Sequence, residues 1–389
     1  MIQASYFPSF ALIGCGTMSF GLVHYMVSLG FQGVFLHDLE PLKVTSLLQK
    51  LQKSYPGLQI IKDPSKQNID VTLLSCSGPA TELFLRESSN HSILGKHRLV
   101  VSLGRPNYDE LKAHQTFHQY LQDHHISLLM GFGIEPGLTE ALAAYLVHSV
   151  ESKQVQDLSI YCGGVPQKAQ PPLYYNRLFG TQLPYLNRDS LWKVNNQVSR
   201  LPRFSLKEKV FVDNIGFFEA YHDGLSPYFL LEESIKKIPY VKQQTLRWPG
   251  FFDAIQLLSS LGLLDDQIVL KNGMTPATFT HTILERKGIL RKNLYDISII
   301  YIVMKLKDGC TRKFRLSAHY DPQTDLTGMS QLTCFTAAFS AKNLLENLTD
   351  RPGIHMSHSW FTNKRIMDFQ KDILQLQPNS IVMEEYDYI

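Results

Sequence analysis

Residues 10–19, FALIGCGTMS, join a short apolar run to a glycine-rich turn. Apolar side chains recur at helical spacing over 17–29, so the sequence predicts a strand, a tight turn and a helix. In such a unit Gly14 permits the tight turn, and Gly16 lets the backbone approach a pyrophosphate at the helix N-terminus. Ser19 stands where the pattern has its third glycine, and serine is small enough to keep the helix near the strand.

An acidic residue ends the second predicted strand, 33–38. Asp38 lies 22 residues after Gly16, and no arginine follows it immediately. A carboxylate at this place accepts a hydrogen bond from a ribose 2′-hydroxyl and repels the 2′-phosphate of NADP. NAD is therefore the expected cofactor and NADP the less favoured one; a surface aspartate after an ordinary strand–helix–strand turn is the alternative. The expected cofactor contacts are Gly14, Cys15, Gly16, Thr17, Met18, Asp38 and Ser77, the last just past the fourth predicted strand.

The first 150 residues alternate strand and helix signals. Further short apolar runs lie at 58–61, 71–75, 99–103 and 126–130, with helical segments at 41–51 and 108–122. Short apolar strands separated by helices are typical of a parallel sheet covered on both faces. We therefore predict an α/β fold that begins with a Rossmann dinucleotide-binding domain.

Beyond residue 154 this alternation fades. Strand-like segments at 157–162, 207–211, 297–305 and 312–316 are separated by longer connections. They predict a second α+β domain built on a mixed or mainly antiparallel sheet. Residues 176–203 are irregular and indicate a long ordered loop over a site, and 328–348 predict a long helix.

Composition and charge exclude several classes of function. The chain has 389 residues, 44% of them hydrophobic and 19% charged, with a net charge of +3. No Lys/Arg block points to nucleic acid or an anionic membrane, and no run of about 18 apolar residues predicts a membrane span. Five widely spaced cysteines and the lack of a signal-peptide pattern indicate a reduced, cytoplasmic protein. His114 and His118 lack the glutamate of a zinc-protease helix and indicate a solvated helix end, so we expect no metal.

Five further segments stand in a fixed order along the chain. They are GFGIEPG at 131–137, YCGGVP at 161–166, EAYHDGL at 219–225, LRWPGF at 246–251 and LGLL at 261–264. This order resembles the saccharopine dehydrogenase family, which includes saccharopine reductases and lysine 6-dehydrogenases. That family has a G-x-x-PG turn, a CGGLP strand end and an LRYPG segment followed by LGLL. The resemblance covers residues 9–350, and CGGVP and LRWPGF are its specific parts.

The resemblance implies a domain organisation and a reaction. A Rossmann domain at 1–138, with a returning helix at 328–350, would be followed by a substrate and dimerisation domain at 139–327 and a C-terminal extension at 351–389. A homodimer acting on a small amino-acid substrate is implied. The implied reaction is hydride transfer between an amine-bearing carbon and NAD, giving an imine that water hydrolyses. Asp38 and the AYHDGL segment are more similar to NAD-dependent lysine 6-dehydrogenases than to NADP-dependent saccharopine reductases.

Two other functions stay open. One is an imine reductase of the carboxynorspermidine dehydrogenase kind, from the same family. The other is a regulatory protein that binds NAD without turnover. SLGRP at 102–106 motivates the second, because many relatives have a Ser-Tyr segment there that lines the site.

The implied chemistry needs a base for the ammonium proton and a donor fork for a carboxylate. Candidate bases are Glu135, at the end of a parallel strand, and the pair His222 and Asp223; a helix N-terminal charge and a solvated turn are the alternatives. Arg247 is the candidate carboxylate anchor, with a structural ion pair as the alternative. Further substrate contacts are expected at Ser102, Cys162 and Gly163, and Arg105 and Arg177 are weaker candidates for the carboxylate anchor.

Overall fold

The computed structural model describes residues 7–87, 92–106, 111–176, 183, 189–270, 273–290, 295–347 and 351–388. The chain divides into two compact units. Unit 1 comprises Met1–Tyr145 and Ser330–Ile373, and unit 2 comprises Leu146–Met329 and Leu374–Ile389. Within the described ranges, no helix has both the length and the apolar character needed to cross a membrane.

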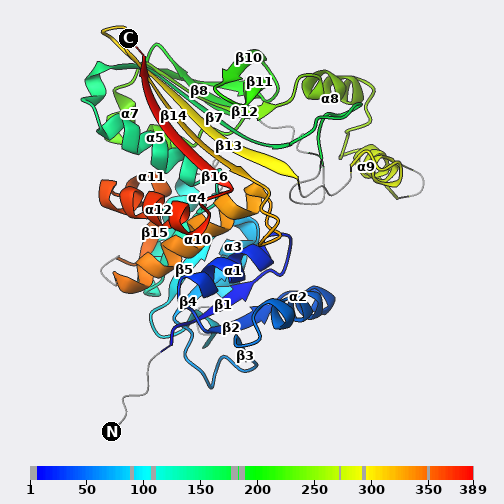
Figure 1. The fold of residues 1–389 in the computed structure, drawn as a ribbon, viewed down its shortest axis with the longest axis vertical. Helices are drawn as coiled ribbons and strands as arrows, with labels where there is room; N and C mark the ends of the chain where they lie inside the picture. Colours follow the sequence, from blue (N-terminus) through cyan, green and yellow to red (C-terminus); the bar gives the residue numbers. More distant parts are fainter. Residues whose placement is uncertain are drawn as a thin grey trace. The chain divides into compact units, whose positions relative to one another are not determined.

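Unit 1 holds a parallel sheet that has seven strands among the described residues (Figure 1). The strands are β1 (Ser9–Ile13), β2 (Gly33–His37), β3 (Gln59–Ile61), β4 (Val71–Leu74), β5 (Leu99–Ser102), β6 (Ser127–Met130) and β15 (Gly353–His355). The helices that begin in this unit are α1 (Ser19–Ser28), α2 (Pro41–Ser54), α3 (Gly78–Glu87), α4 (Leu111–Asp123), α5 (Leu138–His148), α11 (Ser357–Trp360) and α12 (Asn363–Leu376). The spatial order is β15-β6-β5-β4-β1-β2-β3, with every neighbouring pair parallel. The first six strands thus have the Rossmann order, which confirms the predicted fold class.

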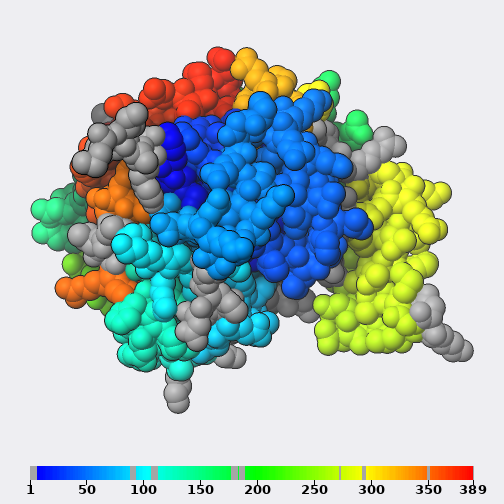
Figure 2. All heavy atoms as spheres, turned by 90° about the horizontal axis from the view of Figure 1, so that it is seen from below, coloured from blue at the N-terminus to red at the C-terminus, as the bar shows by residue number. Residues whose placement is uncertain are grey.

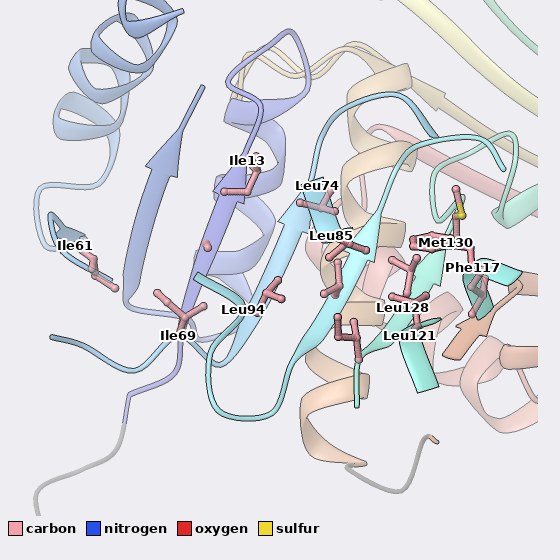
Figure 3. Close-up of a cluster of buried hydrophobic side chains, with 14 residues drawn as sticks. Ile13, Ile61, Ile69, Leu74, Leu85, Leu94, Phe117, Leu121, Leu128 and Met130 are labelled. Atoms are coloured by element: carbon pink, nitrogen blue, oxygen red, sulfur yellow. The ribbon is translucent and has the colours of Figure 1, made fainter. Parts of the chain in front are cut away.

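The core of unit 1 explains why its strands are short apolar runs. Figure 3 shows Ile13 on β1, Leu74 on β4 and Leu128 on β6 of the sheet, and all three are buried. Leu85 of α3 and Leu121 of α4 belong to the same cluster. Because helices cover both faces of a parallel sheet, its strands carry apolar residues at successive positions instead of alternating ones.

Helix α10 (Gly328–Glu346) is the predicted late helix, and residues 330–346 of it belong to unit 1. Its residues are buried on every side from 328 to 341. Phe335 packs edge-on against Tyr25 of α1, and the Cys334 thiol donates to the carbonyl oxygen of Met18 at 3.3 Å. A helix that is buried on all sides needs no amphipathic pattern. The ends of α10 are therefore set by its packing and not by a periodic pattern of apolar residues.

The tail at 351–389, expected as an extension, is shared between the two units. Its strand β15 adds to the parallel sheet beside β6, and α12 also begins in unit 1. Its last strand, β16 (Ile381–Tyr388), pairs with β14 in unit 2. These strands pair with segments far away in the sequence, so no local pattern in the tail predicted them.

Unit 2 holds a mixed sheet that has nine strands in the described ranges. The strands are β7 (Val155–Pro166), β8 (Asp189–Val194), β9 (Gln197–Pro202), β10 (Glu208–Val212), β11 (Gly216–His222), β12 (Tyr240–Arg247), β13 (Asp296–Leu306), β14 (Thr311–His319) and β16. Its helices are α6 (Pro227–Leu230), α7 (Glu233–Lys236), α8 (Phe251–Ser260) and α9 (Pro276–Arg286). Strands β12 and β7 are parallel and the other pairs are antiparallel, as predicted for a mixed sheet.

Two segments of unit 2 differ from simple expectations. The stretch 176–203, predicted as an irregular loop, contains the hairpin of β8 and β9. The segment with α8 and α9 buries Phe251 and Leu284 in the core and exposes Leu261 and Val269. Figure 2 shows this segment, yellow-green to yellow, at the surface.

The two faces of the unit 2 sheet carry different side chains. Strand register places Tyr221 opposite Thr245 and Thr245 opposite Cys162, so these three side chains share one face. We call it the Arg247 face, because Arg247 lies two residues after Thr245 on β12. The opposite face, the Tyr161 face, carries the apolar cluster of Tyr161, Phe218, Leu246 and Tyr301.

A histidine of α4 holds strand β15 in unit 1. The N–H of Ile354 donates to Nδ1 of His118 at 3.0 Å. Burial, with a contribution from the charge of His355, lowers the pKa of His118. A ring nitrogen that accepts a backbone N–H must be unprotonated, so this contact exists only with a neutral ring. The predicted solvated helix end is therefore wrong for His118.

We predict that unit 1 loses stability as the pH falls, partly through His118. An unfolded histidine takes up a proton near pH 6.5, and the folded one does so only at lower pH. Between these values the unfolded state binds more protons, so acid favours unfolding. His118→Asn keeps an acceptor oxygen without titrating in this range. Urea unfolding at pH 7.5 and pH 5 should show a smaller loss for H118N than for the wild type; equal losses would contradict the assignment.

Candidate functional site

The glycine-rich turn of unit 1 closes tightly against neighbouring strands. Gly14 has a φ of +94°, and a Cβ placed on it would lie 2.6 Å from the carbonyl oxygen of Ser75. Its N–H donates to the carbonyl of His37 at 2.8 Å. Only glycine fits this position, so packing within the protein is enough to explain the first glycine of the motif.

Packing within the protein does not require a glycine at position 16. A Cβ there would meet no heavy atom within 4 Å, and Gly16 and Thr17 are exposed. Within the described part of the chain, the N–H groups of Gly16, Thr17 and Met18 donate to no acceptor. Helix α1 has neither a side-chain cap nor an acidic residue in its first turn. Unpartnered amides at the start of a helix attract anions, and this turn leaves room for one.

Asp38 directly follows β2 and holds the turn in place. Its Oδ2 accepts the N–H of Cys15 at 2.7 Å, and its Oδ1 accepts the N–H of Glu40 at 2.8 Å. An ionised carboxylate has about four acceptor positions, so the half-buried Asp38 can accept further hydrogen bonds from a ligand.

Cys15 turns both of its polar groups toward the protein. Its N–H is used by Asp38, and its thiol lies 3.7 Å from the carbonyl oxygen of His37. Burial, followed by the charge of Asp38, raises the pKa of the Cys15 thiol to about 11. Cys15 therefore shapes the turn and has no free donor in its backbone for a cofactor.

The turns after β4 and β5 pack backbone against backbone. A Cβ on Gly78 would lie 1.9 Å from the carbonyl oxygen of Arg105, so this approach requires glycine. Ser77, just before it, is exposed, and its Oγ accepts the N–H of Ala80 at 3.4 Å where α3 begins. Ser77 thus stands at the carboxyl edge of the sheet, beside the turn after β1.

Ser102 lies inside unit 1. Its side chain is fully buried, and its Oγ is hydrogen-bonded to Oγ1 of Thr81 at 2.7 Å and to the N–H of Gly104 at 3.0 Å. The expected substrate contact is therefore wrong for Ser102, because its hydroxyl is already bonded to Thr81 and Gly104 within unit 1. Its hydroxyl instead ties α3 to the turn after β5.

The structure brings Arg105 and Glu135 together in unit 1. Nη2 of Arg105 lies 2.5 Å from both carboxylate oxygens of Glu135. Both side chains are mostly buried, with 22% and 17% of their surface exposed. Two residues predicted separately from the sequence thus form one ion pair at the carboxyl edge of the parallel sheet.

Arg247 is buried on its face of the unit 2 sheet, with 4% of its surface exposed. Its Nη1 donates to the carbonyl oxygens of Leu246 at 2.8 Å and Gly164 at 3.4 Å. The guanidinium carbon lies 5.3 Å from the ring centre of Tyr175 and 5.6 Å from that of Phe251. Among the described residues, Nε has no hydrogen-bond partner and no carboxylate forms a salt bridge with Arg247. Glu219 stands opposite Arg247 in the register, but its carboxylate accepts from Lys207 and from the N–H of Gly250. A buried guanidinium without a paired carboxylate favours the binding of an anion.

Asp223 is already paired. Its Oδ2 accepts hydrogen bonds from Nη2 of Arg203 and from Oγ1 of Thr245, both at 2.6 Å. The side chains of Arg203 and Asp223 are 6% and 7% exposed. This arrangement orients the Asp223 carboxylate on the Arg247 face.

His222 and Asp223 do not act as a pair. Register places His222 opposite Gln244, whose own neighbour Tyr161 marks the other face of the sheet. Burial, with the charge of Lys242, lowers the pKa of His222 to about 4. The expected catalytic pair is therefore wrong, because adjacent residues of a strand point to opposite faces.

The strand end CGGVP lies inside the unit 2 sheet. Cys162 is buried on the Arg247 face. Gly163 is on the Tyr161 face, where a Cβ would lie 2.5 Å from the carbonyl oxygen of Leu246. Gly163 thus permits close strand packing and offers no side chain to a substrate. Arg177 lies outside the described residues.

Sequence reasoning missed two polar residues of the Arg247 face. Tyr221 and Gln243 are buried, and the Tyr221 hydroxyl and the Gln243 Oε1 have no partner among the described residues. Alternation along β11 and β12 could have grouped Tyr221 with Asp223, and Gln243 with Arg247. The missing information was the register that joins the two strands.

Breaking the Arg203–Asp223 pair should destabilise the protein far more than removing Arg247. Asp223→Asn removes the carboxylate charge that pairs with the buried Arg203 guanidinium, and breaking a buried pair of this kind costs about 3–5 kcal/mol. Arg247→Met removes a buried charge that has no carboxylate partner in the described ranges, and its net cost should be about 1 kcal/mol or less. Urea unfolding monitored by circular dichroism measures both. A loss for R247M as large as that for D223N would mean that Arg247 has a structural role.

Comparisons with known proteins agree with this architecture. A structure of apo saccharopine dehydrogenase (L-Glu forming) from Saccharomyces cerevisiae has a TM-score of 0.73 and 16% identity, over 98% of this chain and 100% of that chain. Homospermidine synthase from Legionella pneumophila, solved in complex with NAD, has a TM-score of 0.58 and 10% identity, over 98% and 91%. At these identities the likeness shows a shared fold.

A family comparison reaches the sequence itself. The family model described as the saccharopine dehydrogenase C-terminal domain matches residues 133–375, more than half of the chain. This match begins within the GFGIEPG turn and contains the CGGVP and LRWPGF segments, and it confirms the resemblance found in the sequence. The chain belongs to the saccharopine dehydrogenase family.

Proposed function

We propose that this protein is an NAD-dependent oxidoreductase acting on the CH–NH group of a lysine-like amino acid or of saccharopine. The observation that carries the proposal is the buried guanidinium of Arg247, which has no carboxylate partner among the described residues. A carboxylate-bearing substrate would supply the missing anion. Family membership supports chemistry at an amine-bearing carbon.

The residues of unit 1 fit NAD. The unpartnered amides of Gly16, Thr17 and Met18 would hold the pyrophosphate, and the open side of Gly16 would let it approach. The free acceptor positions of Asp38 suit a ribose hydroxyl, and its charge disfavours the 2′-phosphate of NADP. When bound, NAD supplies a hydride acceptor. The NAD complex of homospermidine synthase supports this choice by fold.

Arg247 would bind the substrate carboxylate. Its Nε–H is the donor without a partner among the described residues, and the rings of Tyr175 and Phe251 flank the guanidinium. A charge-assisted hydrogen bond in a buried site is stronger than one in water. The carboxylate would thus be oriented by a group whose own position is fixed.

Glu135 is our candidate base for the ammonium proton. It follows β6 at the carboxyl edge of the parallel sheet, where such folds place ligands. Arg105 orients both of its carboxylate oxygens. His222 is a poor alternative, because its side chain lies on the Tyr161 face, opposite to that of Arg247.

Gly16→Ala should weaken NAD binding without harming the free protein. The added methyl meets no protein atom within 4 Å, so only a ligand can clash with it. We expect at least a tenfold higher Kd for NAD by calorimetry, about 1.4 kcal/mol, with an unchanged melting temperature. Gly57→Ala is the matched control, because Gly57 is also open and exposed. Equal NAD affinity for G16A, G57A and the wild type would place the cofactor elsewhere.

Turnover should depend on Arg247. With NAD, the wild type should oxidise lysine or saccharopine, and the reaction is measured by the increase in NADH absorbance. Arg247→Met should raise KM at least tenfold, because the carboxylate loses its charged partner. Arg315→Met is the control: Arg315 is equally buried but is paired with Glu384 at 2.5 Å, so its loss should lower stability and leave KM unchanged.

The same assay separates the open alternatives. Activity only in the reductive direction, with an aldehyde, a diamine and NADPH, would identify an imine reductase of the carboxynorspermidine dehydrogenase kind. NAD binding with no turnover of any amine would identify a regulatory protein. Either result would overturn the proposed function.

A further inference from the structure

The Arg247 face of the unit 2 sheet carries a row of buried polar atoms without partners. They are the hydroxyl of Tyr221, Oε1 of Gln243 and Nε of Arg247. Tyr221 is 0%, Gln243 1% and Arg247 4% exposed. Within the described ranges none of these three atoms makes a hydrogen bond, although buried polar atoms in native proteins nearly always do.

The strand register brings these residues onto one surface. Gln243, Thr245 and Arg247 alternate along β12, and Tyr221 of β11 stands opposite Thr245. Tyr221 therefore lies between the two others, diagonal to each. Arg203 pairs with Asp223 beside this row, so that guanidinium is already compensated.

The surroundings of the Tyr221 hydroxyl are polar. Burial raises the pKa of Tyr221, the positive charges of Arg247 and Arg203 oppose that shift, and the charge of Asp223 adds to it. Its ring packs 4.5 Å from the ring of Phe204. The ring is thus fixed by the apolar core, and the hydroxyl stays protonated among charged groups.

We infer that Tyr221 and Gln243 are specificity-determining residues that accept hydrogen bonds from N–H groups of the substrate. The inference rests on the proposed function and extends it to two unassigned residues. Arg247 offers donors only, so it selects the carboxylate. Oε1 of Gln243 is an acceptor only, and the Tyr221 oxygen can also accept, so both select a donor such as an amine. Together the row fits a molecule that carries a carboxylate and an N–H group.

The opposite face provides a matched control on the same strand. Gln244 is 1% exposed, and its Oε1 also has no partner among the described residues. It points to the Tyr161 face, away from Arg247. Gln243 and Gln244 therefore share residue type, burial and strand, and differ in the face that they occupy.

The test compares Tyr221→Phe, Gln243→Met and Gln244→Met. The measurements are KM for lysine or saccharopine at saturating NAD, and the melting temperature of the free protein. Y221F and Q243M should raise KM at least fivefold while keeping or raising the melting temperature, because each removes a buried atom without a partner in the described ranges. Q244M should leave KM unchanged.

Binding measured without turnover separates this inference from the proposed function. The same variants are tested for the rise in melting temperature caused by lysine or saccharopine. If lysine or saccharopine stabilises the wild type and this stabilisation is lost in Y221F and Q243M, the inference is supported even when no NADH forms. The absence of NADH would contradict only the proposed function. Any of three results overturns the inference. The first is equal KM and equal ligand stabilisation for Q243M and Q244M, and the second is a lower melting temperature of Y221F with unchanged KM. The third is the lack of ligand stabilisation in the wild type.

Discussion

The hydrogen bond from the Cys15 N–H to the Asp38 carboxylate is the contact on which the glycine-rich turn of unit 1 depends. It ties the turn after β1 to the end of β2, and the same carboxylate also accepts the N–H of Glu40. The turn is thereby fixed while the amides of Gly16 and Thr17 remain open. A donor array that is rigid before ligand binding loses little entropy when the ligand arrives.

Much of unit 1 could be predicted because its signals are local. Gly14 and Asp38 can be recognised from their spacing to the first two predicted strands, and strands buried on both faces appear as apolar runs. Strands β15 and β16 could not be predicted in this way. Gly353 pairs with Ser127, and Ile381 pairs with Ala318, so these strands form because a distant edge offers hydrogen bonds. The register of such pairs is a property of the folded sheet.

The candidate site shows the same limit at the level of single residues. Ser102 and Arg105 are close in sequence, yet one is fully buried and the other forms an ion pair at the sheet edge. The difference comes from backbone packing between the turns after β4 and β5, which Gly78 and Gly104 allow. In the same way, His222 and Asp223 are neighbours in sequence and lie on opposite faces of a strand. Residue type suggested which side chains could carry chemistry, and strand geometry assigned each of them to a surface.

Arg247 and Arg315 show how a buried charge that is paired within the fold differs from one that has no salt bridge among the described residues. Both are buried arginines of the unit 2 sheet, with 4% of their surface exposed. Arg315 meets Glu384 and the carbonyl oxygen of Asp213, so its charge is compensated within the fold. Arg247 meets only carbonyl oxygens and aromatic rings among the described residues. A buried charge without an ionic partner lowers stability, and Glu219, opposite Arg247 in the register, is paired with Lys207. For this reason we propose that a substrate carboxylate pairs with Arg247.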